Sequence, residues 1–349
     1  METLEDIRLN VPFLRKKVPN LTSAARSVGL RPATVSNLCT GKIPVGRAEV
    51  KTLVALANLA DCSLDDLIIR GEKIDMIETG IKTLDLFAPL AKEGTIGLVA
   101  RPGMGQLVVL AEIFYRLKEG GYTTVLLKPE GDHPDLDEKE DFYEHVTYSI
   151  EETLEKMRKL GKKEIAFATD RSHVLTGELH DLQDRLQEDG IKNITTFLVD
   201  LKGEAMDEDL PYGPLETLWH FDMDLASRKK FPAVNPMYST SSVLEGAHLD
   251  QHHLTIQQRA QKLLRRYREL RALVNARGMD SLPDTERTTY NRGERLEAYL
   301  TQPFYVAEQY TGVKGVSVSL KDTVSDVQKI MDGTTDDRPV DQLTYIGTL

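Results

Sequence analysis

The chain has 349 residues and a net charge of −11, with 40% hydrophobic and 28% charged residues, which is typical of a globular protein of two or three domains. No apolar run approaches the roughly 18–20 residues that a membrane-crossing helix needs, and the acidic start lacks the basic and then apolar pattern of a secretory signal. We therefore expect a cytoplasmic protein with no membrane partner.

Charge is distributed unevenly along the chain. Residues 1–73 hold 11 basic and 8 acidic residues, a net charge of +3, so the remaining residues carry −14. A basic head on an acidic body is typical of a protein whose head binds nucleic acid.

The sequence shows no spacing typical of a metal site. Cys39 and Cys62 fall on expected helices, and we interpret them as small core hydrophobes in a reducing cytosol. Histidines gather between positions 248 and 253, but zinc would need a fixed geometry and a fourth ligand. We expect a solvated loop there and no bound metal.

The segment from residue 22 to residue 41 predicts two short helices joined by a tight turn. The first helix is rich in alanine and ends before Gly29, which allows a sharp turn. Pro32 suits a first helical position, where its missing N–H costs nothing, and Gly41 is a natural stop. The expected apolar seam consists of Leu21, Ala25, Val28, Leu30, Val35 and Leu38.

Two more helices are expected before residue 70. One covers residues 48–60 and turns Val50, Leu53, Leu56, Ala57 and Leu59 inward. The other opens at a capping box, residues 63–66, and buries Leu64 and Leu67.

Helix, glycine turn and a second helix with a small, polar outer face form the helix-turn-helix pattern. Residues 24–42 and 53–67 resemble the phage-repressor-like class of these proteins. The resemblance implies that the helix after Gly29 enters the major groove of double-stranded DNA and that two copies act together. The implied DNA contacts are Arg31, Thr34, Ser36 and Asn37, with Lys42 on a phosphate. The alternative is a small helical bundle that only binds protein.

The rest of the chain predicts a mostly parallel α/β domain. Short apolar segments at residues 95–100, 123–127, 164–168 and 195–200 are separated by helical stretches. Residues 251–332 turn largely helical, with a long run from residue 255 to residue 277. We therefore divide the chain into an all-α head at 1–73, an α/β domain at 74–250 and a helical domain at 251–349.

Strand, glycine loop and helix between residues 95 and 117 have the order of a phosphate-binding loop. Residues 77–98 resemble the start of the nucleotide domain of the ATP synthase beta subunit. Further blocks resemble that family in the same order, at residues 231–242, 278–282, 300–312, 318–324 and 341–347. The resemblance implies a RecA-like P-loop domain followed by a C-terminal helical domain.

The departures from the family bear on catalysis. The family's loop is Gly-x-x-x-x-Gly-Lys-Thr; aligned on Gly103 and Gly105, this chain has Gln106 in place of the lysine and Leu107 in place of the magnesium-binding hydroxyl. Phosphoryl transfer depends on positioning and charge stabilisation, so losing one cation should cost about 3–4 kcal/mol of transition-state stabilisation. We expect no catalytic residue and no efficient hydrolysis.

Other family positions are partly kept. Asp200 matches the Walker B aspartate, while no residue aligns cleanly with the catalytic glutamate. Phe231, Phe304 and Tyr310 match aromatic positions that stack adenine, although three core rings at a domain junction would look the same. Arg101 could replace the lost charge. The expected nucleotide site is therefore Arg101, Gly103, Gly105, Gln106, Phe231, Phe304 and Tyr310, taking ATP or ADP without requiring either.

The leading prediction from the sequence is a DNA-binding protein, regulatory or architectural, located at the nucleoid. Its body is expected to self-assemble into a ring, hexameric as in the family, or into a filament, so that many heads bind together. One alternative is a DNA-linked ATPase with a rebuilt active site. Gln106 and Leu107 argue against it, because they replace the lysine and the magnesium-binding hydroxyl. The other is a decoy or scaffold partner of ATP synthase subunits. The lack of the family's N-terminal β-barrel argues against this alternative.

Overall fold

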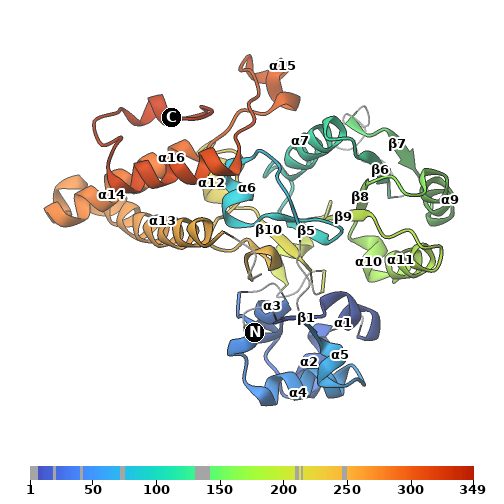
Figure 1. The fold of residues 1–349 in the computed structure, drawn as a ribbon. Coiled ribbons are helices and arrows are strands. Elements are labelled where there is room, and N and C mark those ends of the chain that lie inside the picture. The colour runs from blue at the N-terminus through green and yellow to red at the C-terminus, as the bar shows by residue number, and fades with distance from the viewer. Residues whose placement is uncertain are drawn as a thin grey trace.

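A computed structural model describes residues 7–18, 21–39, 42–70, 75–129, 142–208, 212–213, 215–245 and 250–349. A small head, a seven-stranded sheet flanked by helices, and a group of C-terminal helices follow one another along the chain (Figure 1). In the described ranges, no helix combines the length and the apolar character needed to cross a membrane.

The head is a helical bundle closed by a short sheet. Its helices are α1 (Val11–Lys17), α2 (Leu21–Ser27), α3 (Pro32–Cys39), η1 (Val45–Arg47), α4 (Val50–Leu59) and α5 (Leu64–Leu67). Strands β1 (Ile7–Leu9) and β2 (Ile68–Arg70) pair antiparallel and join the first and last segments of the head. The expectation of an all-α head is therefore wrong, because the backbones of these two apolar-rich segments pair as strands.

Local rules explain the head's turns. Gly29 has φ of 74°, a left-handed conformation that glycine adopts readily, and the N–H of Leu30 donates to the carbonyl of Ala25 at 2.9 Å. The predicted capping box is present in both directions between Ser63 and Asp66.

The prediction that Val50 and Leu64 of the head face inward is wrong. Val50 is 70% exposed and Leu64 is 37% exposed, whereas Leu56 and Leu67 are fully buried. Val50 and Leu64 are each the first residue of their helix, at the edge of the bundle rather than at its centre.

The central sheet has the strand order β11-β10-β5-β9-β8-β6-β7. Its strands are β5 (Thr95–Val99), β6 (Thr123–Leu127), β7 (His145–Thr147), β8 (Ile165–Asp170), β9 (Ile194–Val199), β10 (Thr217–His220) and β11 (Thr240–Ser241). All neighbours are parallel except the edge pair β10–β11, which confirms the predicted mostly parallel sheet.

Helices cover both faces of the sheet. On one face α7 (Gln106–Glu119) packs Phe114 against Phe197, whose ring also lies 6.1 Å from that of Trp219. On the other face α9 (Ile150–Leu160) and α11 (Glu178–Glu188) bury Met157 and Leu182, and the short α10 (Ser172–Leu175) precedes α11. Strands buried on both faces are near-continuously apolar, as parallel strands must be.

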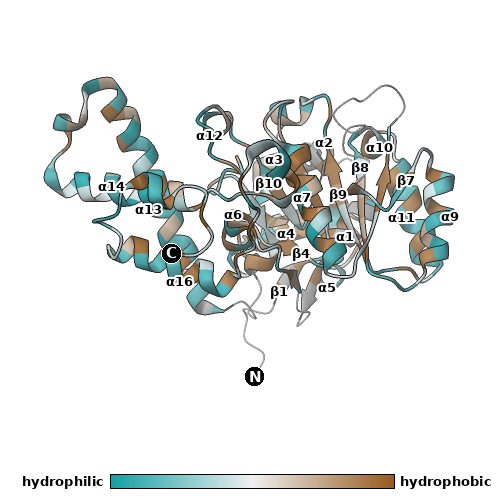
Figure 2. Ribbon diagram, turned by 90° about the horizontal axis from the view of Figure 1, so that it is seen from above, coloured by the Kyte–Doolittle hydropathy of each residue, from teal (hydrophilic) through white to brown (hydrophobic). Residues whose placement is uncertain are grey.

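The C-terminal region is a helical layer. It contains α12 (Met223–Ser227), η4 (Ser242–Glu245), α13 (Gln251–Arg277), η5 (Met279–Ser281), α14 (Asp284–Tyr299), η6 (Tyr305–Ala307), α15 (Glu308–Thr311), α16 (Leu320–Asp332) and η7 (Val340–Leu343). Helix α6 (Lys82–Phe87) packs its Leu86 and Phe87 into the same core. Figure 2 shows the strands as mainly hydrophobic and α13 and α14 as mainly hydrophilic.

The start of α13 differs from the prediction. The helix begins at Gln251 because Asp250 accepts the N–H of His252 at 2.9 Å as an N-cap. His253 is therefore buried, 3.0 Å from the carbonyl oxygen of Leu86, rather than part of a solvated loop. Residues 246–249 lie outside the described residues.

One short strand pair and one turn complete the described part of the body. Strands β3 (Met76–Ile77) and β4 (Leu90–Ala91) pair antiparallel and lead into β5. The turn η3 (Glu204–Asp207) follows β9, so that it lies at the same end of the sheet as the loop after β5.

Candidate functional site

The glycine loop follows β5, a central strand flanked by β9 and β10. Ligands of α/β proteins bind at this carboxyl edge of the parallel strands. Gly103 and Gly105 have φ of 85° and 88°, and Gly105 is the residue from which α7 begins. The backbone therefore keeps the left-handed turns and the helix N-terminus that suit a phosphate.

The two substituted positions are the first two residues of α7. Gln106 is 5% exposed and Leu107 is 6% exposed. Leu107 belongs to the main core of the sheet, so that the position of the expected hydroxyl now serves packing. Gln106 is neutral and leaves the loop with the helix dipole but without a lysine charge.

Arg101 is held beside the loop by an acidic partner. Its Nη2 lies 2.8 Å from Oδ1 of Asp207 in η3, with the two side chains 50% and 68% exposed. Exposed pairs of this kind contribute less than about 1 kcal/mol. A bound anion could therefore compete with Asp207 for the guanidinium.

The loop after β9 packs closely against the glycine loop. A Cβ at Gly203 would lie 2.6 Å from Cδ of Pro102, and Gly203 has φ of 76°. Only glycine fits this approach, because both the space and the backbone conformation exclude a side chain.

The Walker B-like aspartate serves this loop. Oδ1 of Asp200 accepts the N–H of Lys202 at 3.0 Å, and Oδ2 accepts the N–H of Ala205 at 2.5 Å. The Asp200 side chain is almost fully buried. Its oxygens thus stabilise η3.

The three aromatic residues lie in different surroundings. Phe231 lies beside the loop, since a Cβ added at Gly105 would lie 3.5 Å from its ring. Phe304 is 5% exposed and packs in the same core as Leu107. Tyr310 is 87% exposed on α15, so in this structure it does not close the aromatic pocket that the resemblance implies.

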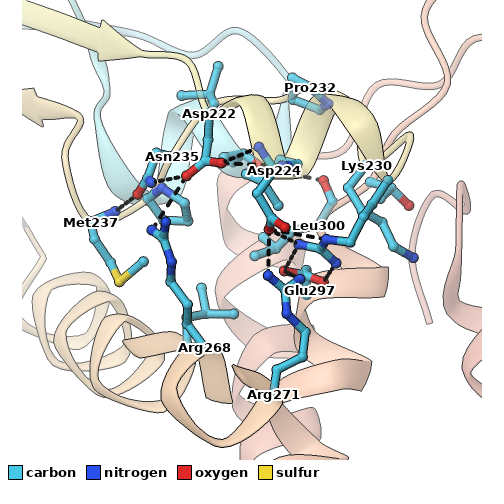
Figure 3. Close-up of a pocket in the computed structure, with 17 residues that line it drawn as sticks. Asp222, Asp224, Lys230, Pro232, Asn235, Met237, Arg268, Arg271, Glu297 and Leu300 are labelled. Carbon is cyan, nitrogen blue, oxygen red and sulfur yellow. Dashed lines mark hydrogen bonds and ion pairs between the residues drawn. The ribbon is translucent and has the colours of Figure 1, made fainter. Parts of the chain in front are cut away.

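An ion-pair cluster that the sequence analysis did not identify lies just before Phe231. Arg228, the C-cap residue of α12, binds Glu297 of α14 through Nη1 at 2.5 Å and Nη2 at 2.9 Å, and its Nη2 also binds Asp224 at 2.8 Å. In Figure 3, Arg271 reaches from α13 toward the same carboxylates, with Nη2 2.5 Å from Asp224. Although burial opposes it, the hydrogen bonds from the two arginines hold the pKa of Asp224 below its usual value.

The cluster connects α12 to α13 and α14, and we call it the joint; it is not a ligand site. Asp222 accepts the α12 N-terminal amides and the amide group of Asn235, and lies 3.4 Å from Arg268. The cavity between these side chains is about 50 Å³, room for a few waters but far below a small-molecule site. Three arginines face three carboxylates, and these ion pairs fix α12, and with it Phe231, against the C-terminal helices.

The residues predicted to contact DNA lie outside the buried stripe of α3. Val35, Leu38 and Cys39 are buried, whereas Arg31 and Lys42 are exposed. Thr34, Ser36 and Asn37 are partly exposed on the remaining faces of the helix.

Two similarities to known proteins concern the body of the chain. Residues 244–338 match the family described as the C-terminal domain of V and A type ATP synthase. This match supports the ATP synthase-like interpretation of the C-terminal region that the sequence blocks imply. The solved structure titled "Structure of a unique ATP synthase subunit NeqB from Nanoarcheaum equitans" is similar over 75% of this chain and 77% of that chain, with a TM-score of 0.57 and 14% sequence identity. Neither similarity identifies the head as a helix-turn-helix.

Proposed function

We propose that this protein is a non-hydrolysing relative of ATP synthase subunits that acts as a scaffold, packing its body against other subunits of that type or against copies of itself. The observation that carries the proposal is the retained fold around α7 combined with Gln106 and Leu107 at its first two positions. An ATPase fold without its cation and metal ligand keeps the surfaces for assembly and loses the chemistry.

The surroundings of the loop support the same conclusion. Leu107 is part of the core, and the Asp200 carboxylate is bound to backbone N–H groups, so neither is placed to hold magnesium. Backbone amides at the start of α7, with Phe231 beside them, still suit ATP or ADP. Such a nucleotide would act as a ligand without efficient hydrolysis.

The proposal is tested by two measurements on the purified full-length chain. Phosphate release from magnesium ATP, with and without DNA, should not exceed the protein-free rate. Sedimentation with and without ATP synthase subunits from the same organism should show a complex larger than the monomer. Sustained magnesium-dependent turnover, or a chain that stays monomeric under both conditions, would contradict the proposal; turnover that needs DNA would support the ATPase motor instead.

DNA binding by the head is a second candidate function. It is favoured by the turn at Gly29 between α2 and α3, which leaves the polar residues of α3 outside the bundle's core. An arginine or asparagine there can read base edges in the major groove. A scaffold that assembles many such heads would bind DNA through combined weak contacts.

Fluorescence anisotropy with a labelled duplex, selected from a random-sequence pool for binding to the parent protein, tests the head directly. Arg31→Ala should weaken binding about tenfold or more, since a good base contact is worth about 1–3 kcal/mol. Lys51→Ala removes the same charge from α4 and should change the affinity by less than about threefold, as expected for a rim charge. Equal losses for both variants, or no binding by the parent protein at low salt, would exclude the role given to α3.

A further inference from the structure

A groove outside the phosphate loop is walled by two tyrosines. It lies between α7, the segment before α6 and η6, is open to solvent, and offers about 460 Å³. The rings of Tyr115 and Tyr305 have centroids 5.4 Å apart and are inclined by 34°, close to an offset stack. Glu78 and Glu119 also line the groove. A volume of this size is in the range of sites that hold a small ligand or one large side chain.

The groove is electronegative. Burial raises the pKa of the Tyr115 phenol, and the carboxylates of Glu119, Glu112 and Glu308 raise it further. Glu112 is neutralised by the buried guanidinium of Arg116 at 2.7 Å. Among the described residues no cation pairs with Glu119, so this carboxylate faces the groove with its charge uncompensated.

The groove already stacks one guanidinium against a tyrosine. The Cζ of Arg116 lies 5.1 Å from the Tyr305 ring centroid. Its Nη1 and Nη2 donate to the carbonyls of Thr79 at 3.1 Å and Val316 at 2.8 Å. Because Arg116 is committed to these partners, it does not pair with Glu119, whose carboxylate stays available to a cation from outside.

We propose that the groove beside the paired rings of Tyr115 and Tyr305 binds an arginine side chain presented by a segment of a protein partner. The planar guanidinium stacks on an aromatic face and forms hydrogen bonds to a carboxylate at its edge, which the compact, strongly hydrated ammonium of lysine does less well. DNA is repelled by the same charges. The inference rests on the scaffold function for its purpose, namely to hold a partner that is basic where this body is acidic.

The test uses short peptides, so that its failure leaves subunit association unaffected. The probe is a fluorescein-labelled five-residue peptide of glycine and serine with one central arginine, compared with the same peptide carrying lysine. Tyr115→Ala and Glu119→Gln should each weaken the arginine peptide at least fivefold. The lysine peptide should bind the parent protein at least threefold more weakly than the arginine peptide.

Matched controls remove the same groups elsewhere. Tyr148→Ala deletes a tyrosine that is 60% exposed, and Glu151→Gln deletes a carboxylate that is 75% exposed on α9. Both should change the affinity less than twofold. Equal losses in all four variants would show general attraction to an acidic protein and overturn the proposal. It would equally be overturned if the peptides do not bind while Tyr115→Ala abolishes self-association, because the occupant would then be a second copy.

Discussion

At the scale of single residues, the least expected feature is a fully buried lysine. Lys82 donates through Nζ to the carbonyls of Tyr299 at 2.5 Å and Ile346 at 2.8 Å, and lies 4.1 Å from the Tyr299 ring centroid. Burial lowers its pKa to about 7, although Asp326 acts in the opposite direction. The lysine thus ties the segment at 346–347 to α6 and α14.

Replacing Lys82 should change how stability depends on pH. The pKa is about 7 in the folded protein and 10.5 as the ordinary value, so between these limits the unfolded chain binds more protons. Stability due to Lys82 therefore rises with pH across that window, by at most about 1.4 kcal/mol per pH unit. Urea unfolding of the parent protein and of Lys82→Met is measured at pH 7 and at pH 9. The free energy of unfolding of the parent, minus that of the variant, should be larger at pH 9 than at pH 7. A difference that is the same at both pH values would contradict the assignment.

At the scale of elements, the strands were the most predictable part. Each of the four predicted strands has five or six largely buried residues, so a run of apolar and β-branched residues identifies it. β7 and β10 were not predicted because they have three and four residues, too few for a pattern. Their positions are set by pairing with β6 and β5, which is information that neither segment contains.

In the candidate site, too, features that are local in sequence could be predicted, and features that join distant segments could not. The glycines and the two substituted residues of the loop are consecutive in sequence, so their grouping could be predicted from the motif. The joint formed by Arg228, Arg271 and Glu297 could not, because 69 residues separate Arg228 from Glu297. Each of the three looks like an ordinary surface charge on its own helix.

Removing one carboxylate from this joint should be costly. Glu297→Gln leaves Arg228 and Arg271 to share Asp224, and breaking a buried ion pair costs about 3–5 kcal/mol. The Glu297 side chain is 14% exposed, which places the expected loss near the lower end of that range. Urea unfolding followed by Trp219 fluorescence measures it. Glu151→Gln, whose partner Arg185 is 3.8 Å away at the surface, is the control and should cost less than about 1 kcal/mol.

The volume-matched pair Arg228→Met with Glu297→Met sharpens this test. Removing both charges together should recover much of the stability lost by Glu297→Gln, since apolar pairs often replace buried ion pairs without loss. If the double variant is less stable than the single one, the joint contributes through specific hydrogen bonds rather than through balanced charge.

At the scale of the whole molecule, the chain combines separate cores. The head's buried cluster contains Leu14, Leu38 and Leu56, and shares no described residue with the cluster around Trp219. The charges differ as well, with +3 on residues 1–73 and −14 on the rest. Such a division suits a protein in which the body assembles and the head makes a separate contact.

Separate cores predict separate unfolding. Trp219 is the chain's single tryptophan and is fully buried in the body, so its fluorescence reports the body alone. Leu56→Ala, in the head, should lower head stability by about 2–5 kcal/mol, the cost of truncating a buried leucine. Far-ultraviolet circular dichroism should then show an earlier helical transition, while the Trp219 midpoint in urea stays unchanged. Leu182→Ala, beneath the sheet, should instead lower the Trp219 midpoint. If Leu56→Ala moves the Trp219 midpoint as far as Leu182→Ala does, head and body unfold as one cooperative unit, and the head cannot act as an independently folded module.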